Sequence, residues 1–273
     1  MTVILVTARV LPHDDDEAGL LLAALRARGV ACRVAAWDDG AARWDDAALI
    51  LLKSPWNYAD ALTDFMAWGR GLQAPVLNPW ALVEWNVHKR YLAGMAGAVP
   101  TRVVARGEAA ALRAADGDAA GRVVVKPAVG AGARGAMLGR WDDPAVVAHL
   151  AALLQRGDAL VQPFVADVAA GEVSLLYFDG VFSHAVRKVP ADGDYRVQVQ
   201  YGGVVERHAP SPAELALGAA ALAACPLAPL YARVDMVGAT PLLMELEVIE
   251  PELFLFEDEG AAERLADAIV RRL

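Results

Sequence analysis

Residues 122–135 read RVVVKPAVGAGARG, a run of valines followed by a lysine and a glycine-rich turn. The valines predict a buried strand over residues 122–127, because β-branched side chains favour strands. Lys126 interrupts this apolar run, and a lysine on an interior strand is costly unless it meets an anion. The stretch therefore predicts a strand that brings a lysine to an anionic ligand beside a flexible turn.

The turn, residues 130–135, matches G-x-G-x-x-G, the fingerprint of dinucleotide-binding folds. In that fingerprint the glycines end a strand and start a helix, whereas here a strand-like run follows and the next helix begins at Pro144. Glycines between two adjacent strands predict a hairpin flap whose backbone N–H groups can fold over a triphosphate. A protein-kinase glycine-rich loop is also a hairpin, but its lysine follows the loop. Taken alone, the motif fits an ordinary flexible loop equally well, and a Rossmann oxidoreductase is the least favoured class.

The first 80 residues alternate strands and helices in the order typical of a parallel α/β unit. Short apolar runs predict strands over residues 2–8, 30–37 and 48–53. Acidic residues at 14–17 mark the start of a helix that ends at Gly29, and a second helix is expected over residues 60–72. We therefore expect a small parallel sheet covered by helices.

The remaining residues mix strands with helices, so the chain as a whole is of the α/β (α+β) class. Helices are expected over residues 79–96, 108–115, 144–156 and 212–224 and at the C-terminus, and strands after Pro100 and over residues 122–127, 136–141, 159–165, 172–178, 181–189, 231–237 and 242–249. The pattern predicts an N-terminal domain over residues 1–80, a central domain with the flap over 81–160 and a C-terminal domain over 161–273.

Two glutamates near the end of the chain, Glu245 and Glu247, share one face of a predicted strand, because side chains alternate along a strand. Asp235 lies on the strand before it. If the two strands pair, three carboxylates come together and repel each other unless they hold a cation, and an oxygen-only cluster suits Mg²⁺. The alternative is an acidic strand face exposed to solvent.

The net charge of the 273-residue chain is -9, from 34 Asp plus Glu against 25 Lys plus Arg. This balance argues against nucleic acid or an acidic membrane as a partner, because both need a basic face. The two cysteines, Cys32 and Cys225, are isolated in the sequence, which favours neither a disulfide framework nor a zinc site. The chain shows no signal-peptide pattern and no apolar run of the roughly 20 residues that span a bilayer. We expect a cytoplasmic protein.

Taken together, these residues resemble the ATP-grasp superfamily, in particular the carboxylate–amine ligase branch that includes glutathione synthetase and the ribosomal protein S6 modification enzymes. The resemblance covers nearly the whole chain. It implies an ATP-grasp fold, in which an N-terminal α/β domain precedes two α+β subdomains that clasp ATP. Family members hold the ATP phosphates with two lysines and a glycine-rich flap, and the matching residues here are Lys89, Lys126, Gly130, Gly132 and Gly135.

In the same family, a hinge of the type Gln-Glu-aromatic-aliphatic bonds adenine through its backbone. The hinge here reads Gln162-Pro163-Phe164-Val165. Pro163 replaces the usual glutamate and removes a side chain and an N–H group. Asp167 and Glu172 are weaker matches to acidic positions near the ribose.

The resemblance also implies catalytic and metal-binding residues. Arg196 lies in a segment similar to the one whose arginine contacts the transferred phosphoryl group, and Lys188 lies at a basic position upstream. The closing family motif, Asp followed by Glu-x-Asn, binds magnesium, and the residues at its positions here are Asp235, Glu245 and Glu247. Because Glu247 replaces the usual Asn, it adds a negative charge that either strengthens Mg²⁺ binding or favours another ion such as Mn²⁺. Of the four lysines in the chain, Lys53 alone is left without a role.

Within the superfamily, three stretches look most like a compact bacterial group that includes the enzyme that cyclises O-ureido-serine to cycloserine. The stretches are SPWNY at residues 54–58, WNVHKRYL at 85–92 and IEPELFL at 249–255. Candidate substrate contacts come from the N-terminal domain and from the side opposite it: Arg9, Ser54, Trp56, Asn57, Tyr58, Arg187 and Gln198.

The implied function is an ATP-dependent ligase. It activates a small, amino-acid-like carboxylate as an acylphosphate, which an amine-type nitrogen then attacks, from a second molecule or from the same one. The alternatives are an ATP-grasp kinase that leaves phosphate on its product and a nucleotide-binding regulatory module without catalysis. The family also favours a homo-oligomer.

Overall fold

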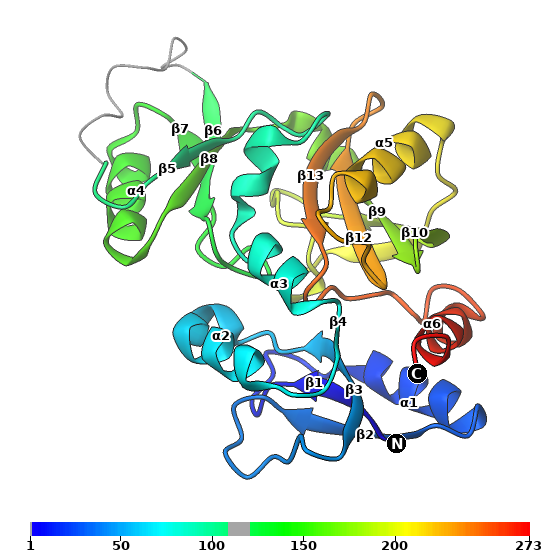
Figure 1. Cartoon of the computed structure of the whole chain (residues 1–273). Helices are drawn as coiled ribbons and strands as arrows, with labels where there is room; N and C mark the ends of the chain where they lie inside the picture. The colour runs from blue at the N-terminus through cyan, green and yellow to red at the C-terminus, as the bar shows by residue number, and fades with distance from the viewer. Residues whose placement is uncertain (1, 109–120) are drawn as a thin grey trace.

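A computed structural model describes residues 2–108 and 121–273 of the chain. Within these residues the strands form three sheets, which surround a central region in Figure 1. The first is a parallel sheet at the bottom of the view, and the other two are antiparallel and lie above it on the left and the right. The mixed α/β (α+β) fold class expected from the sequence is therefore confirmed.

The N-terminal sheet has the strand order β2-β1-β3-β4, and all of its neighbours are parallel. Its strands are β1 (Thr2–Thr7), β2 (Ala31–Ala36), β3 (Ala47–Ser54) and β4 (Val76–Leu77), and its helices are α1 (Asp16–Ala27), the 3₁₀ turn η1 (Tyr58–Ala61) and α2 (Leu62–Gly71). The three strands predicted from the sequence are confirmed. The two-residue β4 is too short to leave a pattern in the sequence.

The second sheet has the order β5-β8-β6-β7 and is antiparallel. Its elements are β5 (Arg102–Val104), β6 (Arg122–Pro127), β7 (Met137–Arg140), β8 (Ala159–Pro163) and the covering helix α4 (Pro144–Arg156). Because β6 pairs directly with β7, the glycine-rich turn joins the strands of a hairpin, as predicted. The helix expected over residues 108–115 lies, beyond Glu108, outside the described residues. The predicted boundary between the central and C-terminal domains, after residue 160, falls inside strand β8. The division into domains stays a prediction.

The helical stretch expected over residues 79–96 is divided in the structure. It forms α3 (Trp80–Asn86) and the 3₁₀ segment η2 (Lys89–Gly94). Between them, the Lys89 backbone N–H donates to the Ala128 carbonyl oxygen at 2.8 Å instead of continuing the helix. The expectation of one continuous helix was wrong at this point, and the break ties the backbone of Lys89 to the residue that follows β6.

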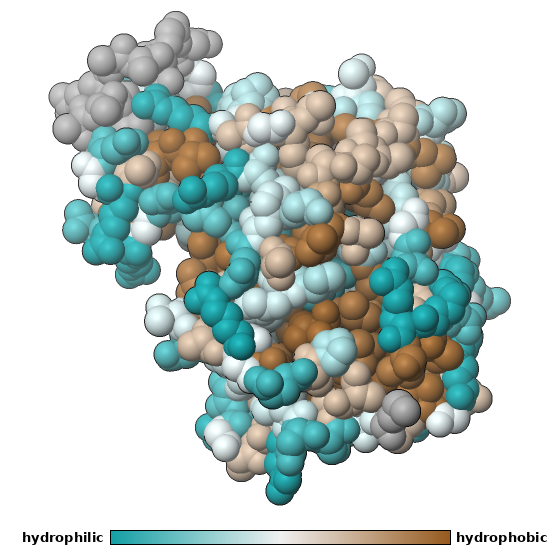
Figure 2. All heavy atoms as spheres, in the orientation of Figure 1, coloured by the Kyte–Doolittle hydropathy of each residue, from teal (hydrophilic) through white to brown (hydrophobic). Residues whose placement is uncertain are grey.

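The third sheet has the order β11-β10-β9-β12-β13. Its elements are β9 (Glu172–Phe178), β10 (Val181–Val189), β11 (Val204–Arg207), β12 (Tyr231–Val237), β13 (Leu242–Glu247), the 3₁₀ turns η4 (Ala166–Ala170) and η5 (Val199–Tyr201), and the helices α5 (Pro212–Ala223) and α6 (Ala261–Val270). The alanine-rich α5 gives the weakly apolar, tan surface at the upper right of Figure 2.

Buried contacts tie the third sheet to the N-terminal sheet. The Asn78 side chain, fully buried after β4, donates to the carbonyl oxygens of Tyr231 and Val248 at 2.8 and 2.7 Å. Leucines of α1 share a hydrophobic core with α6 and with residues 253–255, so the end of the chain returns to its beginning, as Figure 1 shows. This packing places the segment after β13 against the N-terminal loops. No helix of the described residues has the length and apolar character that crossing a bilayer requires.

Candidate functional site

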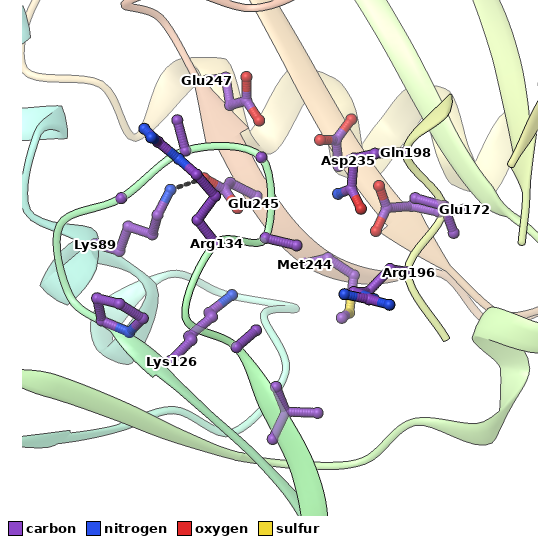
Figure 3. A pocket seen from close by; sticks show the side chains of 18 of the residues that line it. Lys89, Lys126, Arg134, Glu172, Arg196, Gln198, Asp235, Met244, Glu245 and Glu247 are labelled. Atoms are coloured by element: carbon purple, nitrogen blue, oxygen red, sulfur yellow. Dashed lines mark hydrogen bonds and ion pairs between the residues drawn. The ribbon is translucent and has the colours of Figure 1, made fainter. Parts of the chain in front are cut away.

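A cavity lies where the three sheets meet, and most of the residues expected to bind ligands line it. These are Trp56, Tyr58, Lys89, Lys126, Gly130, Gly132, Gln162, Phe164, Val165, Glu172, Arg196, Gln198, Asp235, Glu245 and Glu247. Figure 3 shows the two lysines on one side of the cavity and Asp235, Glu172 and Gln198 on the other. Residues as far apart in the sequence as Trp56 and Glu247 are therefore brought to one site.

The two lysines differ in their partners. Lys89 forms an ion pair with Glu245 on β13. Lys126 is at the end of β6, and among the described residues no carboxylate lies within 4.0 Å of its ammonium group. Burial lowers the pKa of Lys126, as does the neighbouring Lys89, although Glu245 opposes the effect. A desolvated cation without a carboxylate partner fits an anionic ligand such as a phosphate.

The flap between β6 and β7 lies against the N-terminal loop. Gly132 and Gly135 have φ angles of 60° and 75°, where a Cβ atom would strain the backbone. Arg134, a flap residue to which the sequence had given no role, reaches across with its guanidinium. Its Nη1 lies 2.8 Å from Asp60 Oδ2, and its Nη2 donates to the Trp56 carbonyl oxygen at 2.9 Å. The flap is therefore held over the cavity by contacts to the N-terminal loop.

Strands β12 and β13 bring the predicted carboxylates together. Asp235 is directly opposite Glu245, and Arg233 is directly opposite Glu247. The Arg233 guanidinium donates to both Asp235 oxygens, at 3.0 Å each for Nε to Oδ1 and Nη2 to Oδ2, and it also pairs with Glu247. Arg233 had no role predicted from the sequence, although its position two residues before Asp235 puts both side chains on the same face of the strand.

The electrostatics of this strand pair show an excess of negative charge. Although burial by itself raises the pKa of Asp235, Arg233 and Lys188 lower it to a value well below its usual range. For Glu247 the opposite holds: burial, together with the neighbouring Glu245 and Asp235, raises its pKa to about 8 in spite of Arg233. The lysines and arginines of the site therefore do not balance its carboxylates.

The carboxylates fit a hard divalent cation in their chemistry. All three candidate ligands, Asp235, Glu245 and Glu247, offer oxygen atoms, which Mg²⁺ and Mn²⁺ prefer. Within residues 2–108 and 121–273, no three Asp, Glu, His or Cys side chains converge in the arrangement of a metal site. Lys89 and Arg233 occupy Glu245 and Glu247 in ion pairs. A cation would share these oxygens with, or take them from, the two basic side chains.

The two residues assigned to catalysis lie in different surroundings. Lys188 is buried, 2.6 Å from Glu172 Oε1 and 3.4 Å from Asp235 Oδ1, and it does not line the cavity. Arg196 does line it. Its guanidinium is paired with Asp194 at 2.7 Å and lies 3.7 Å from the centroid of the Tyr201 ring. Lys188 therefore supports the carboxylates from behind, whereas Arg196 can reach a ligand.

The hinge residues follow β8 at the edge of the cavity. Phe164 lies under the Arg122 guanidinium, 4.3 Å from the ring centroid, and its backbone N–H donates to the Arg122 carbonyl oxygen. The Gln162 side chain donates to Thr101 Oγ1 at 2.8 Å. The hinge thus presents an aromatic face and backbone groups, while Asp167 and Gly135 do not line the cavity.

Four of the expected substrate contacts do not line the cavity. The Ser54 hydroxyl donates to Thr7 Oγ1, and Asn57 bridges Trp37 and Asp38, so both residues stabilise the N-terminal domain. The exposed Arg9 is held through its backbone N–H by Asp38 Oδ1. The fourth residue, Arg187, turns to the Ala170 carbonyl oxygen and to His208. Polar residues beside a strand end thus serve local hydrogen bonds here.

Trp56, Tyr58 and Gln198 remain at the cavity. The buried Gln198 Oε1 has no hydrogen-bond partner among the described residues, and Figure 3 shows this side chain near Asp235 and Glu172. Further lining residues had no predicted role, and they include His13, Asn86, Arg134, Glu250 and Glu252. The last two lie in the IEPELFL stretch, whose likeness to one bacterial group was the available signal.

Comparisons with known proteins place this geometry in context. Two family models match the chain: the N-terminal domain of D-cycloserine synthetase DcsG over residues 3–78, and the ATP-grasp domain of prokaryotic glutathione synthetase over residues 88–252. Cycloserine biosynthesis protein DcsG of Streptomyces lavendulae is 34% identical, over 98% of both chains. The crystal structure of D-cycloserine synthetase DcsG superposes with a TM-score of 0.90 at 32% identity, over 100% of this chain and 99% of that one. D-alanine–D-alanine ligase from Bacillus anthracis, with a TM-score of 0.66 at 15% identity over 99% and 96%, shares the fold.

Proposed function

The chain belongs to the ATP-grasp family, and from this premise we propose that it is an ATP-dependent ligase that closes a ring within one small amino-acid-like molecule. The observation that carries the proposal is that one cavity holds both sets of residues. It joins Lys89, Lys126 and the flap to the carboxylates of β12 and β13, and it extends to Trp56 and Tyr58 of the N-terminal loop. One end is suited to a nucleotide and the other to a small substrate.

In this proposal ATP lies between the two antiparallel sheets. Lys126 and Lys89 neutralise the phosphates, and Gly130 and Gly132 allow the flap backbone to approach them. The adenine lies against the hinge, with Phe164 and Val165 at its edge. The half-buried ammonium group of Lys126, which has no carboxylate within 4.0 Å among the described residues, supports this placement, because a phosphate supplies the missing negative charge.

Asp235, Glu245 and Glu247 would hold Mg²⁺, with Mn²⁺ as the alternative. When bound, such an ion neutralises the charge that develops on the phosphates during transfer. The excess of negative charge at Glu247 supports this assignment. Lys188, which does not line the cavity, holds Glu172 in place, and Arg233, which does line it, holds Asp235.

The reaction begins with the substrate carboxylate, which is a poor electrophile. A carboxylate oxygen attacks the γ-phosphorus, the bond to the β-phosphate oxygen breaks, and ADP leaves with that electron pair. A nitrogen of the same molecule then attacks the carbonyl carbon of the acylphosphate, phosphate leaves, and the nitrogen gives up its proton. Arg196 stabilises negative charge on the phosphoryl group in both steps, and the closed flap with Arg134 excludes water that would hydrolyse the acylphosphate.

We assign O-ureido-serine as the substrate and cycloserine as the final product. Bond formation between the oxygen-linked nitrogen and the carboxyl carbon gives the five-membered ring. Water then hydrolyses the carbamoyl group, which leaves as CO₂ and ammonia while the ring nitrogen takes up a proton. The likeness to a D-cycloserine synthetase over nearly the whole length of both chains supports this choice. The two cysteines are free, which supports a reducing cytoplasm as the location.

The test is ADP release by the purified chain with ATP and Mg²⁺ against O-ureido-serine of both configurations, amino acids and simple hydroxamates. We expect ADP release with O-ureido-serine, together with a cyclic product that carries no phosphorus. A phosphorylated product would identify a kinase instead. ATP binding without turnover on any compound would identify a regulatory module.

A further inference from the structure

One wall of the cavity combines two segments that are nearly 200 residues apart in the sequence. Trp56 and Tyr58 come from the loop after β3, and Glu250 comes from the segment after β13. The Trp56 Nε1–H donates to the Glu250 carbonyl oxygen at 3.0 Å, and the Tyr58 hydroxyl donates to the Glu250 carboxylate. The His13 ring packs on Trp56 with centroids 4.5 Å apart. We call these four residues the aromatic-acidic wall.

Among the described residues, Glu250 has no basic side chain within 4.0 Å, unlike the other lining carboxylates, of which Glu252 has only the His13 imidazole, at 3.9 Å. Its residue is 8% exposed, and it faces the cavity. A lysine or arginine nitrogen lies within 4.0 Å of each of Glu172, Asp235, Glu245 and Glu247. In the part of the chain that the structure describes, no Lys, Arg or His nitrogen lies that close to the Glu250 carboxylate. Within the described residues, the side-chain partner of the Glu250 carboxylate is the hydroxyl of Tyr58.

A buried carboxylate without a cation loses much of its hydration and gains few protein contacts in return. It therefore lowers the stability of the fold unless a ligand supplies the missing positive charge. A primary ammonium group is the matching ligand, because it brings one positive charge and three N–H donors. The wall also contains the rings of Trp56 and Tyr58, and a cation positioned over the face of such a ring is stabilised by it. An anion or an apolar group would find no such partner at Glu250.

We propose that Glu250 binds the ammonium group of an α-amino-acid substrate and so makes the site specific for amino acids over carboxylic acids without an amino group. Trp56 and Tyr58 hold the Glu250 backbone and carboxylate in place, and the substrate carboxylate points away from this wall towards the phosphates. This inference rests on the proposed function, since it assigns the group that recognises the substrate of that same cavity.

The experiment compares two ligands by isothermal titration calorimetry, with ADP and Mg²⁺ present and therefore without turnover. The ligands are O-ureido-serine and 3-(ureidooxy)propionate, which is the same molecule without its amino group. The wild-type chain should bind the amino compound at least about 10-fold more tightly, because a charge-assisted contact to a buried carboxylate contributes about 10- to 100-fold in affinity. Glu250→Gln should bring the two affinities close together and leave ADP binding unchanged.

Two further variants complete the test. Glu250→Asp keeps the charge and should restore part of the preference for the amino compound. Glu259→Gln makes the same substitution at an exposed position that does not line the cavity, and it should keep the full preference. The assignment is overturned if the wild type binds both ligands with equal affinity, or if it binds neither ligand at millimolar concentration. It is also overturned if Glu250→Gln keeps the preference of the wild type for the amino compound. If the preference follows Glu250 but no ADP is released with O-ureido-serine, the ammonium site stands and the proposed ring closure fails.

Discussion

Asp235 on β12 and Glu245 on β13 are directly opposed in the register of the two strands, and the ammonium group of Lys89 meets the same Glu245. Like charges that face each other across strands destabilise a sheet unless a cation lies with them. In the proposed function, Lys89 and a metal ion compete for the carboxylate oxygens of this pair, and a nucleotide phosphate competes with Glu245 for Lys89. The proposed reaction depends on this pair.

Glu245→Gln tests that dependence. The amide keeps the shape of the side chain but loses the charge that meets Lys89 and a metal ion. We expect turnover at saturating ATP to fall by at least about 100-fold, because loss of a group that orients a metal already costs 10- to 100-fold. ATP should still bind, since Lys126 and the hinge are unchanged. Undiminished ADP release would refute the assignment of Glu245 to the metal.

Metal binding should release a proton near neutral pH. The pKa of Glu247, raised by burial and by Glu245 from its usual 4.5 to about 8 although Arg233 opposes the shift, favours the protonated carboxyl beside Arg233 at pH 7 in the metal-free protein. A cation needs the carboxylate, so Mg²⁺ binding should release up to one proton per site at pH 7 and almost none at pH 9.5. Calorimetry of Mg²⁺ binding in buffers of different ionisation enthalpy measures this number.

The same shift has a consequence for stability without metal. Between about pH 5 and 8 the folded chain retains the Glu247 proton that the unfolded chain has released, so this group makes the metal-free protein less stable as the pH rises through that range. Glu247→Gln removes both effects. If the variant releases as many protons on Mg²⁺ binding as the wild type, the proton comes from another group and the account of Glu247 is wrong.

Lys53 gains a structural role from its buried partners. Its ammonium group lies 3.1 Å from both Asp15 Oδ1 and Glu17 Oε2, and Glu17 accepts the backbone N–H groups of Leu253 and Leu255. Lys53→Met leaves two buried carboxylates without a cation, so we expect a loss of about 3–5 kcal/mol in the free energy of unfolding. Urea denaturation followed by tryptophan fluorescence measures it.

The control for Lys53 is Arg43→Met. Arg43 pairs with Asp45 at 2.6 Å, but both side chains are exposed, and such a pair contributes little to stability. We expect its urea midpoint to match the wild type. Equal midpoints for the Lys53 and Arg43 variants would show that the buried network does not stabilise the fold.

Arg134→Ala tests the closed flap. Without its contacts to Asp60 and to the Trp56 carbonyl oxygen, the flap covers the cavity less well, and water reaches the acylphosphate. We expect more ADP than cyclic product, with the ratio rising by about 3- to 10-fold over the wild type. The exposed Arg156 on α4 supplies the control, and Arg156→Ala should leave the ratio at one. A ratio unchanged in Arg134→Ala would contradict the role given to the flap.

The sequence predicted those parts of the fold that depend on local pattern. The valines before Lys126 and the alternation around Glu245 determine strands, and the glycines between two strands determine the hairpin, because each rests on neighbouring residues. The break at Lys89 was not predicted, because it arises from a hydrogen bond to Ala128, which lies in a different part of the chain.

The same limit explains the errors at the site. Asn57 and Arg187 have side chains typical of substrate contacts, but their partners, Asp38 and His208, are set by packing that no local pattern shows. Arg233 and Glu250 were missed for the converse reason. Their importance comes from residues that the fold brings opposite them.

The central claim is that the substrate carboxylate is activated as an acylphosphate. It is tested most directly with O-ureido-serine whose carboxylate oxygens are both ¹⁸O, incubated with the enzyme, ATP and Mg²⁺, followed by mass spectrometry of the released phosphate. Our account predicts one ¹⁸O atom in each phosphate released with cyclic product, because the carboxylate oxygen that attacked the γ-phosphorus leaves with it. Phosphate without ¹⁸O would contradict the claim.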